Sequence, residues 1–184
     1  RLQVPGLHNV QNALAAATAA YALRIPPTHI ESGLSQYAGV KGRLQRKTGQ
    51  HNATLIDDTY NANPDSVRAA IAVLAAEPGR RVLVLGDMGE LGARGSLLHA
   101  EIGTAARQAG IDHLLTLGDL SQAAAMSFGS GARHFETLDA LCAALEQLLE
   151  RGTTVLVKGS RFMRMERVVE RFANGEPQAA RGGH

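Results

Sequence analysis

The chain of 184 residues contains one cysteine, no tryptophan and only 4% aromatic residues. A single cysteine cannot form a disulfide within the chain, and Cys142 lies in the apolar stretch LDALCAALEQLL, so we expect it in the core. Nucleic-acid binding would require aromatic rings for base stacking among clustered basic residues. Because aromatics are scarce and the net charge is only +2, the sequence argues against a nucleic-acid partner.

Long apolar runs are also missing. Hydrophobic residues make up 45% of the chain, yet no stretch approaches the roughly 20 apolar residues that a membrane helix needs. The first residues, RLQVPGLHNV, show neither a basic start with an apolar run nor a small-residue cleavage site, so no secretory signal is visible. These features exclude a membrane span and favour a cytoplasmic protein.

The first part of the chain is predicted to be helical. Apolar residues at helical spacing predict a helix over residues 9–23, and two prolines end it. A short second helix should follow, with Thr28 as its N-cap and Glu31 completing a capping box. Two glycines within residues 39–42 then mark a flexible joint.

After this joint, short apolar runs alternate with amphipathic stretches, which is typical of an α/β fold. Runs such as VLVL and TVLV are apolar at consecutive positions, so we expect a mainly parallel, doubly wound sheet with helices on both faces. The predicted organisation is a helical unit over 1–43, an α/β domain over 44–174 and a disordered tail over 175–184. Strands are expected at 54–57, 82–85, 113–117, 133–135 and 154–157, with another near 44–48, and helices at 64–76, 96–109, 121–128, 138–150 and 162–172.

Polar residues gather in the loop DDTYNANPDS after the first of the main strands. Ligands of parallel α/β sheets bind at the carboxyl ends of the strands, where this loop should lie. Asn63 precedes a proline and is expected to cap the next helix. Capping needs only one residue, so Asp57, Asp58, Tyr60 and Asn61 favour a binding function over a purely structural turn.

The loop KGSRFMRME follows the last predicted strand and places Lys158, Ser160 and Arg161 at its end. Arginine binds phosphate and carboxylate oxygens bidentately, and lysine supplies a compact charge. Cations at a helix N-terminus are unfavourable unless an anion compensates them. The loop therefore predicts a site for an anionic group rather than a solvated helix start.

Other polar groups leave two interpretations open. Asp87 and Glu90 in GDMGELG either hold a cation or complete a tight turn; the stretch lacks the GxGxxG pattern, so a dehydrogenase is not indicated. His99 is expected to be a half-buried structural residue. Asn9 and Asn12, three residues apart on one helical face, either read an adenine edge or serve as an N-cap and an exposed amide. Arg43 either reaches a phosphate or lies along the surface.

Six motifs occur in a fixed order between residues 6 and 166: GLHNVQNALAA, KGRL, LIDDTYNANPDS, VLGDMGELG, LHAEIG and VLVKGSRFMRME. Together they resemble the Mur ligase family, in particular the branch that adds D-alanyl-D-alanine to the peptidoglycan precursor. The resemblance implies a Rossmann-like C-terminal domain, preceded at 1–43 by the last helices of a central ATPase domain. It also implies ATP and Mg²⁺ as cofactors, a carboxylate of UDP-MurNAc-tripeptide that is phosphorylated, and attack on the acyl phosphate by the D-alanyl-D-alanine amine.

The resemblance also implies roles for individual residues. Asn9 and Asn12 would contact adenine, Arg43 the phosphates and Asp58 the ribose. The dipeptide side of the cleft would be lined by Tyr60, Asn61, Asn63, Lys158, Ser160 and Arg161.

The sequence departs from the family pattern in lacking a GxxxxGK[ST] phosphate loop. The phosphate loop and the metal-holding residues belong to the missing N-terminal and central domains, so we expect no catalytic residue or metal ligand in this piece and no activity from it alone. Two alternatives remain: a sister ligase acting on another amino acid or on folate, such as a folylpolyglutamate ligase, and a non-catalytic domain that binds a nucleotide or a cell-wall fragment.

Overall fold

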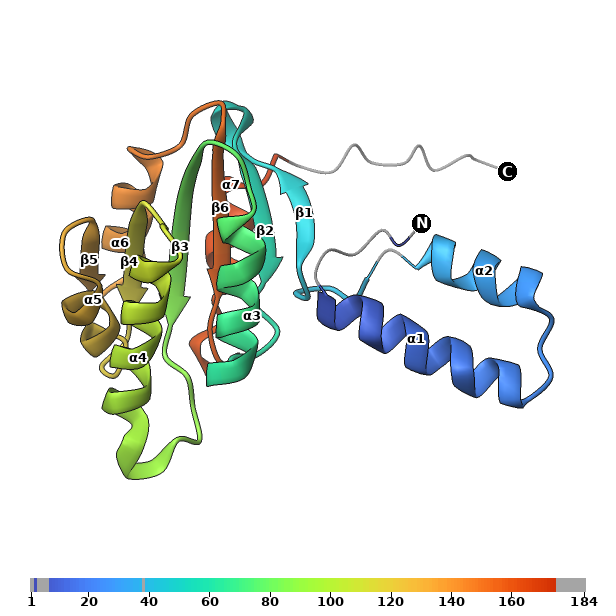
Figure 1. The fold of residues 1–184 in the computed structure, drawn as a ribbon. Coiled ribbons are helices and arrows are strands. Elements are labelled where there is room, and N and C mark those ends of the chain that lie inside the picture. Colours follow the sequence, from blue (N-terminus) through green and yellow to red (C-terminus); the bar gives the residue numbers. More distant parts are fainter. Residues whose placement is uncertain (1, 3–6, 38, 175–184) are drawn as a thin grey trace.

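A computed structural model describes residues 2, 7–37 and 39–174, and it divides into two parts (Figure 1). Helices α1 (Leu7–Ala22) and α2 (Pro27–Gln36) run side by side and form a helical hairpin. The remaining elements form an α/β part in which strands and helices alternate, as the sequence predicts. The expected tail at 175–184 lies outside the described residues.

The α/β part is built on one six-stranded sheet with the strand order β1-β2-β6-β3-β4-β5. Strand β1 is antiparallel to β2, and the other neighbours pair in parallel, which confirms the predicted mainly parallel sheet. The strands are β1 (Gln45–Thr48), β2 (Thr54–Asp58), β3 (Arg80–Gly86), β4 (His113–Leu117), β5 (Ala132–Phe135) and β6 (Thr153–Lys158).

Helices cover both faces of the sheet. One face packs against α3 (Pro64–Ala75), α4 (Gly95–Gln108) and α5 (Gln122–Phe128), and the other against α6 (Leu138–Glu146) and α7 (Glu166–Phe172). In β6, Val155 and Val157 belong to the core under α6 and α7, whereas Leu156 belongs to the opposite core. Apolar residues at consecutive strand positions thus fill two cores, which is the arrangement that VLVL and TVLV predict.

Three expectations about helix ends are wrong. Thr28 lies inside α2, whose N-cap is Pro26 without a side-chain hydrogen bond, so the predicted capping box does not form. The predicted helix over 138–150 already ends at Glu146. The predicted helix over 162–172 splits into a 3-10 turn, Arg161–Met163, and α7, because Arg164 adopts a left-handed conformation with φ 52° between them.

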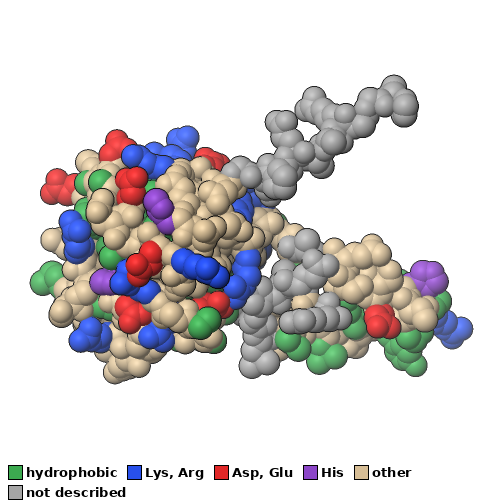
Figure 2. Space-filling view, turned by 90° about the horizontal axis from the view of Figure 1, so that it is seen from above, with side chains coloured by type: hydrophobic (Ala, Val, Ile, Leu, Met, Phe, Trp, Pro, Cys, Tyr) green, Lys and Arg blue, Asp and Glu red, His purple; other side chains and the backbone are tan. Residues whose placement is uncertain are grey.

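Cys142 confirms the expected core position. It is fully buried on α6 beside Leu141 and Leu145, and burial raises the pKa of its thiol. Among the described residues, no helix combines the length and apolarity that crossing a bilayer requires. On the face shown in Figure 2, basic and acidic side chains are interspersed over the α/β part.

Gly103 on α4 tests the helix packing. Alanine normally stabilises a helix interior by about 1 kcal/mol relative to glycine. A Cβ at Gly103, however, would lie 2.0 Å from the backbone oxygen of Ala124 on α5. We therefore expect Gly103→Ala to lower the free energy of unfolding by about 1–3 kcal/mol in urea titrations. Thr104→Ala, at the exposed neighbouring position, is the control and should change it by less than about 0.5 kcal/mol.

Candidate functional site

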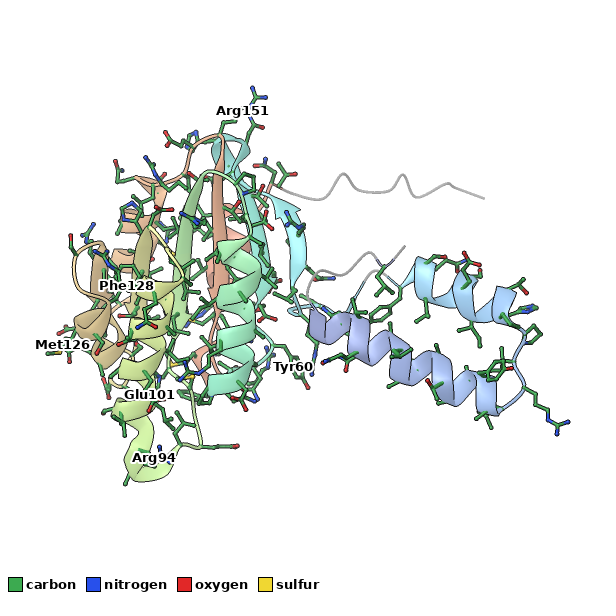
Figure 3. All side chains as sticks on the ribbon, viewed as in Figure 1. Tyr60, Arg94, Glu101, Met126, Phe128 and Arg151 are labelled. Atoms are coloured by element: carbon green, nitrogen blue, oxygen red, sulfur yellow. The ribbon has the colours of Figure 1, made fainter. Side chains whose placement is uncertain are left out.

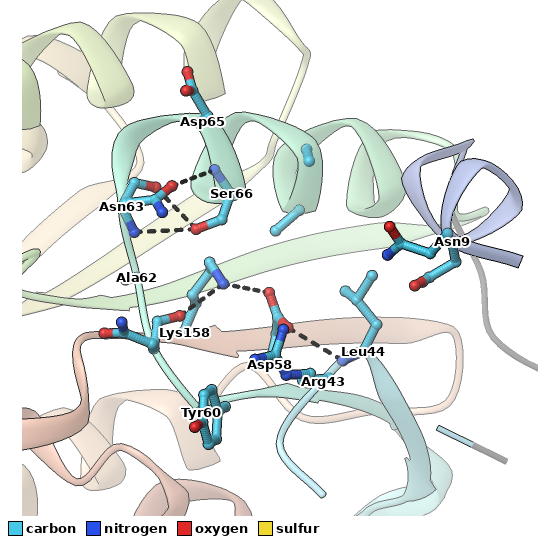
Figure 4. Close-up of a pocket in the computed structure, with 14 residues that line it drawn as sticks. Asn9, Arg43, Leu44, Asp58, Tyr60, Ala62, Asn63, Asp65, Ser66 and Lys158 are labelled. Carbon is cyan, nitrogen blue, oxygen red and sulfur yellow. Dashed lines mark hydrogen bonds and ion pairs between the residues drawn. The ribbon is translucent and has the colours of Figure 1, made fainter. Parts of the chain in front are cut away.

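A pocket of about 490 Å³ opens where the carboxyl ends of β2 and β6 face the start of α1. Tyr60 lies there, between the α/β part and α1 (Figure 3). The pocket brings together residues that are far apart in the sequence (Figure 4). The predicted site residues that line it are Asn9, Asn12, Arg43, Asp58, Tyr60, Asn61, Asn63 and Lys158.

An ion pair forms the floor of the pocket. Asp58 and Lys158 are register partners at the ends of β2 and β6, and the Lys158 Nζ lies 2.6 Å from the Asp58 Oδ2. The same ammonium donates to the backbone oxygen of Asn61 at 2.9 Å. Both residues are buried, with 8% of Asp58 and 3% of Lys158 exposed. Lys158 therefore fixes the Asp58 carboxylate and the loop that follows β2.

The joint between the two parts is attached to this floor. The backbone adopts left-handed conformations at Gly42 (φ 74°) in the joint and at Leu44 (φ 49°) just after it, and the Leu44 side chain is buried in the core. The backbone N–H of Leu44 donates to the Asp58 Oδ1 at 3.2 Å, and that of Tyr60 donates to the Gly42 oxygen at 2.9 Å. A Cβ at Gly42 would lie 3.0 Å from the Tyr60 nitrogen, so this close approach favours glycine.

Arg43 packs against the ring of Tyr60. Its guanidinium carbon stands 4.5 Å from the centroid of the Tyr60 ring, a cation–π contact at the mouth of the pocket. The side chain of Arg43 is exposed, so its cationic group is available to an anion on this side.

Asn9 and Asn12 approach the same site from α1. Together with Arg43 and Tyr60 they also line an adjoining opening of about 300 Å³. Since α1 begins at Leu7, Asn9 lies within the first helical turn, and the alternative in which it serves as the N-cap is wrong. Asn12 is exposed at the pocket edge, where its amide can reach a ligand.

Asn63 confirms the predicted cap of α3. Its Oδ1 accepts the backbone N–H of Ser66 at 2.8 Å, while the Ser66 Oγ accepts the N–H of Asn63 at 3.0 Å. This capping box holds the first turn of α3 beside the pocket, and Asp65 and Ser66 line the pocket as well. The sequence interpretation missed these two residues, although their place in the turn after the predicted cap was a usable signal.

Ser160 lies next to the pocket but not in its lining. Its buried hydroxyl accepts the N–H of Gly89 at 2.6 Å and donates to the backbone oxygen of Ala62 at 3.2 Å. Its own N–H donates to the Asp87 oxygen at 2.9 Å. Ser160 therefore ties together the loops that follow β2, β3 and β6.

Arg161 also stands outside the lining. Its backbone N–H reaches the Asn61 Oδ1 at 3.4 Å, but its guanidinium pairs with Glu166 at 3.2 Å and is 68% exposed. The substrate-binding roles of Ser160 and Arg161 stay predictions.

Other acidic residues are structural. Asp57 accepts the Thr59 hydroxyl at 2.7 Å and lies 3.5 Å from the Lys47 Nζ, so it completes a turn rather than binding a ligand. Asp87 accepts the N–H groups of Leu120 at 3.2 Å and Ser121 at 2.7 Å. Asp87 therefore holds the loop after β4, and these contacts test neither the cation nor the tight-turn interpretation of GDMGELG. The described residues contain no group of three His, Cys, Asp or Glu side chains placed to hold a metal ion.

Comparison with known proteins assigns the family. The sequence profile described as "Mur ligase, glutamate ligase domain" matches residues 42–161, more than half of the chain. The chain belongs to the Mur ligase family.

Several ligases of this family are similar in sequence and fold. The chain is 45% identical over 170 residues to the UDP-N-acetylmuramoyl-tripeptide–D-alanyl-D-alanine ligase of Escherichia coli K12; the match covers 91% of the chain and 37% of the relative. The crystal structure of MurF from Acinetobacter baumannii superposes with a TM-score of 0.84 at 38% identity, over 93% of this chain and 38% of that one. MurF from Thermotoga maritima, solved in complex with ADP, is 24% identical with a TM-score of 0.79, over 91% of this chain and 38% of that one, and shows the same fold. The chain thus spans somewhat more than a third of the length of these relatives.

Lys158→Met tests the ion pair on the pocket floor. Removing the ammonium leaves the Asp58 carboxylate buried without its cation, so we expect the free energy of unfolding to fall by about 3–5 kcal/mol in urea titrations at pH 7. The double variant Asp58→Asn/Lys158→Met should recover part of this loss because the unpaired charge is gone. Arg68→Met is the matched control: Arg68 pairs with Glu101 at 2.9 Å on the exposed surface, and its loss should cost less than about 1 kcal/mol. Equal effects of the two single variants would contradict the assignment.

Proposed function

We propose that the chain is the C-terminal portion of the ATP-dependent ligase that joins D-alanyl-D-alanine to UDP-MurNAc-tripeptide through an acyl phosphate. The observation that carries the proposal is the pocket between α1 and the ends of β2 and β6. It collects amides, an arginine and a carboxylate that belong to three separate motifs of the sequence. The name of the E. coli relative supports the choice of D-alanyl-D-alanine as the acceptor.

The nucleotide side of the proposal rests on the residues near the joint. Asn9 and Asn12 offer amides that can both donate to and accept from an adenine edge. Arg43 supplies the cation for phosphate oxygens. The Asp58 carboxylate, oriented by Lys158, would accept the ribose hydroxyls. The donor set and the volume of about 490 Å³ suit a nucleoside phosphate, and the ADP complex of the T. maritima relative supports the same ligand class.

The acceptor side of the proposal uses the two loops after β2 and β6. Tyr60, Asn61 and Asn63 would contact the dipeptide directly, because their side chains are exposed in the pocket lining. Lys158 would hold the loop after β2 in place through its hydrogen bond to the backbone oxygen of Asn61. Ser160 and Arg161 would complete this side, with Ser160 fixing the Ala62 backbone.

Phosphoryl transfer requires cations around the transferring oxygens and exclusion of water from the acyl phosphate. Mg²⁺ would supply part of that charge when bound with ATP. By resemblance to the family, we assign the metal and the phosphate loop to the N-terminal and central domains of the same enzyme. This chain contributes binding, orientation and closure of the site. We also propose that the enzyme is cytoplasmic.

The helical hairpin supports a central-domain partner. Neither α1 nor α2 has a buried side chain among its described residues, and Leu14, Tyr21 and Leu23 are 67%, 69% and 77% exposed. The family profile begins only at residue 42. We therefore assign residues 1–43 to the last helices of the central ATPase domain and residues 44–174 to the C-terminal domain, with the joint at 39–42.

Release of ADP tests the proposed function. The 184-residue chain alone should give no turnover with ATP, Mg²⁺, UDP-MurNAc-tripeptide and D-alanyl-D-alanine. A chimaera of the E. coli ligase that carries this chain in place of its matching segment should release ADP in a coupled assay. Its kcat/KM should be at least about tenfold higher with D-alanyl-D-alanine than with D-alanine, D-glutamate or L-alanine.

The control is the chimaera with Met126→Ala, a substitution at a 77% exposed position on α5, which should leave turnover unchanged. A chimaera that melts like the E. coli enzyme but prefers a single amino acid would identify a sister ligase instead. One that binds ADP without turnover would favour a non-catalytic binding domain.

A further inference from the structure

We propose that His99 is a positioning residue for the pocket, holding its wall in place through the loop that follows β3. His99 lies on α4 and is not part of the pocket lining. The inference rests on the proposed function only in treating that pocket as the ligand site.

His99 makes two directional contacts. Its Nε2 accepts the N–H of Met88 at 2.9 Å, and its Nδ1 lies 2.7 Å from the backbone oxygen of Gly95. An amide N–H can only donate and a carbonyl oxygen can only accept, so this geometry requires a neutral ring with its proton on Nδ1. The side chain is 0% exposed, which corrects the expectation of a half-buried histidine. It links the start of α4 to the loop over residues 86–92.

The residues on both sides of Met88 hold Ser160. The backbone oxygen of Asp87 accepts the Ser160 N–H at 2.9 Å, and the N–H of Gly89 donates to the Ser160 Oγ at 2.6 Å. These contacts need the Met88 peptide groups in one orientation, which is the orientation that His99 fixes.

Ser160 passes this constraint to the pocket wall. Its hydroxyl donates to the backbone oxygen of Ala62, which lines the pocket beside Asn61. Asn61 is in turn fixed by Lys158 at its backbone oxygen and by the Arg161 N–H at its side chain. A continuous series of hydrogen bonds therefore runs from His99 through two loops to the wall that faces the ligand.

The side chains that could replace His99 differ in the contact they preserve. Glutamine reaches far enough to place an amide oxygen where Nε2 accepts from Met88. Asparagine is shorter and can reach only the Gly95 oxygen, leaving the buried Met88 N–H without an acceptor. A role in positioning therefore predicts that Gln and Asn behave differently, whereas simple packing does not.

NMR of the 184-residue chain tests the proposal with ADP as the probe. In His99→Asn, amide hydrogen exchange should accelerate at Met88 and Gly89, and ADP titration should give a Kd about tenfold higher than in the unsubstituted chain. His99→Gln should keep slow exchange and a Kd within about threefold. The control is Leu145→Ala, which opens a cavity in the core under α6 on the other face of the sheet. It should lower the melting temperature but leave the Kd unchanged.

The results distinguish a positioning role of His99 from general destabilisation. Equal losses in His99→Asn and His99→Gln, or the same loss in Leu145→Ala, would overturn the proposal, because general destabilisation would then account for the effect. If the unsubstituted chain does not bind ADP, the proposed nucleotide site fails, and exchange still decides the role of His99. Unchanged exchange at Gly89 and Ser160 in His99→Asn would refute it. If His99→Asn does not fold, His99→Leu takes its place in every comparison. Leucine keeps the apolar packing and, like asparagine, gives the Met88 N–H no acceptor.

Discussion

The buried ion pair between Lys158 and Asp58 joins the ends of two neighbouring strands, and the pocket depends on it. The ammonium also fixes the loop after β2, and the carboxylate also accepts the backbone N–H of Leu44, just after the joint. A single buried pair thus aligns three segments of the chain around one site. Both partners have to be present, because one buried charge without the other would lower the free energy of unfolding.

The sheet is Rossmann-like, but the site is not at the crevice between β3 and β6. The loops after β2 and β3 lead to α3 and α4 on one face and the loop after β6 leads to α7 on the other, so a ligand crevice is expected on either side of β6. Met165 occupies the space between β3 and β6: a Cβ at Gly159 would lie 2.6 Å from its Cγ, and one at Gly86 would lie 2.9 Å from its sulfur. Ser160 then ties the loops together. The pocket forms instead beside β2, facing α1.

Sequence patterns predicted the strands and the polar loops at their carboxyl ends, because apolar runs and capping residues are local signals. The contact between Asp58 and Lys158 joins residues 100 positions apart, and it follows from strand order, which no local pattern contains. Part of the structural role of Asp57 was missed for the same reason, since its partner Lys47 lies on the antiparallel strand β1, whereas its contact with Thr59 is local. Thr28 failed as a cap because proline at the preceding position already begins the helix.

The location of a bound nucleotide tests the account most directly. In crystals of the chain grown with ADP, the ribose hydroxyls should lie within hydrogen-bonding distance of the Asp58 carboxylate, with the base against Asn9 and Asn12 and the phosphates near Arg43. The Lys158–Asp58 pair should remain intact beneath the nucleotide. Electron density for ADP at the ends of β3 and β6, with Met165 displaced and the pocket beside β2 empty, would contradict the account.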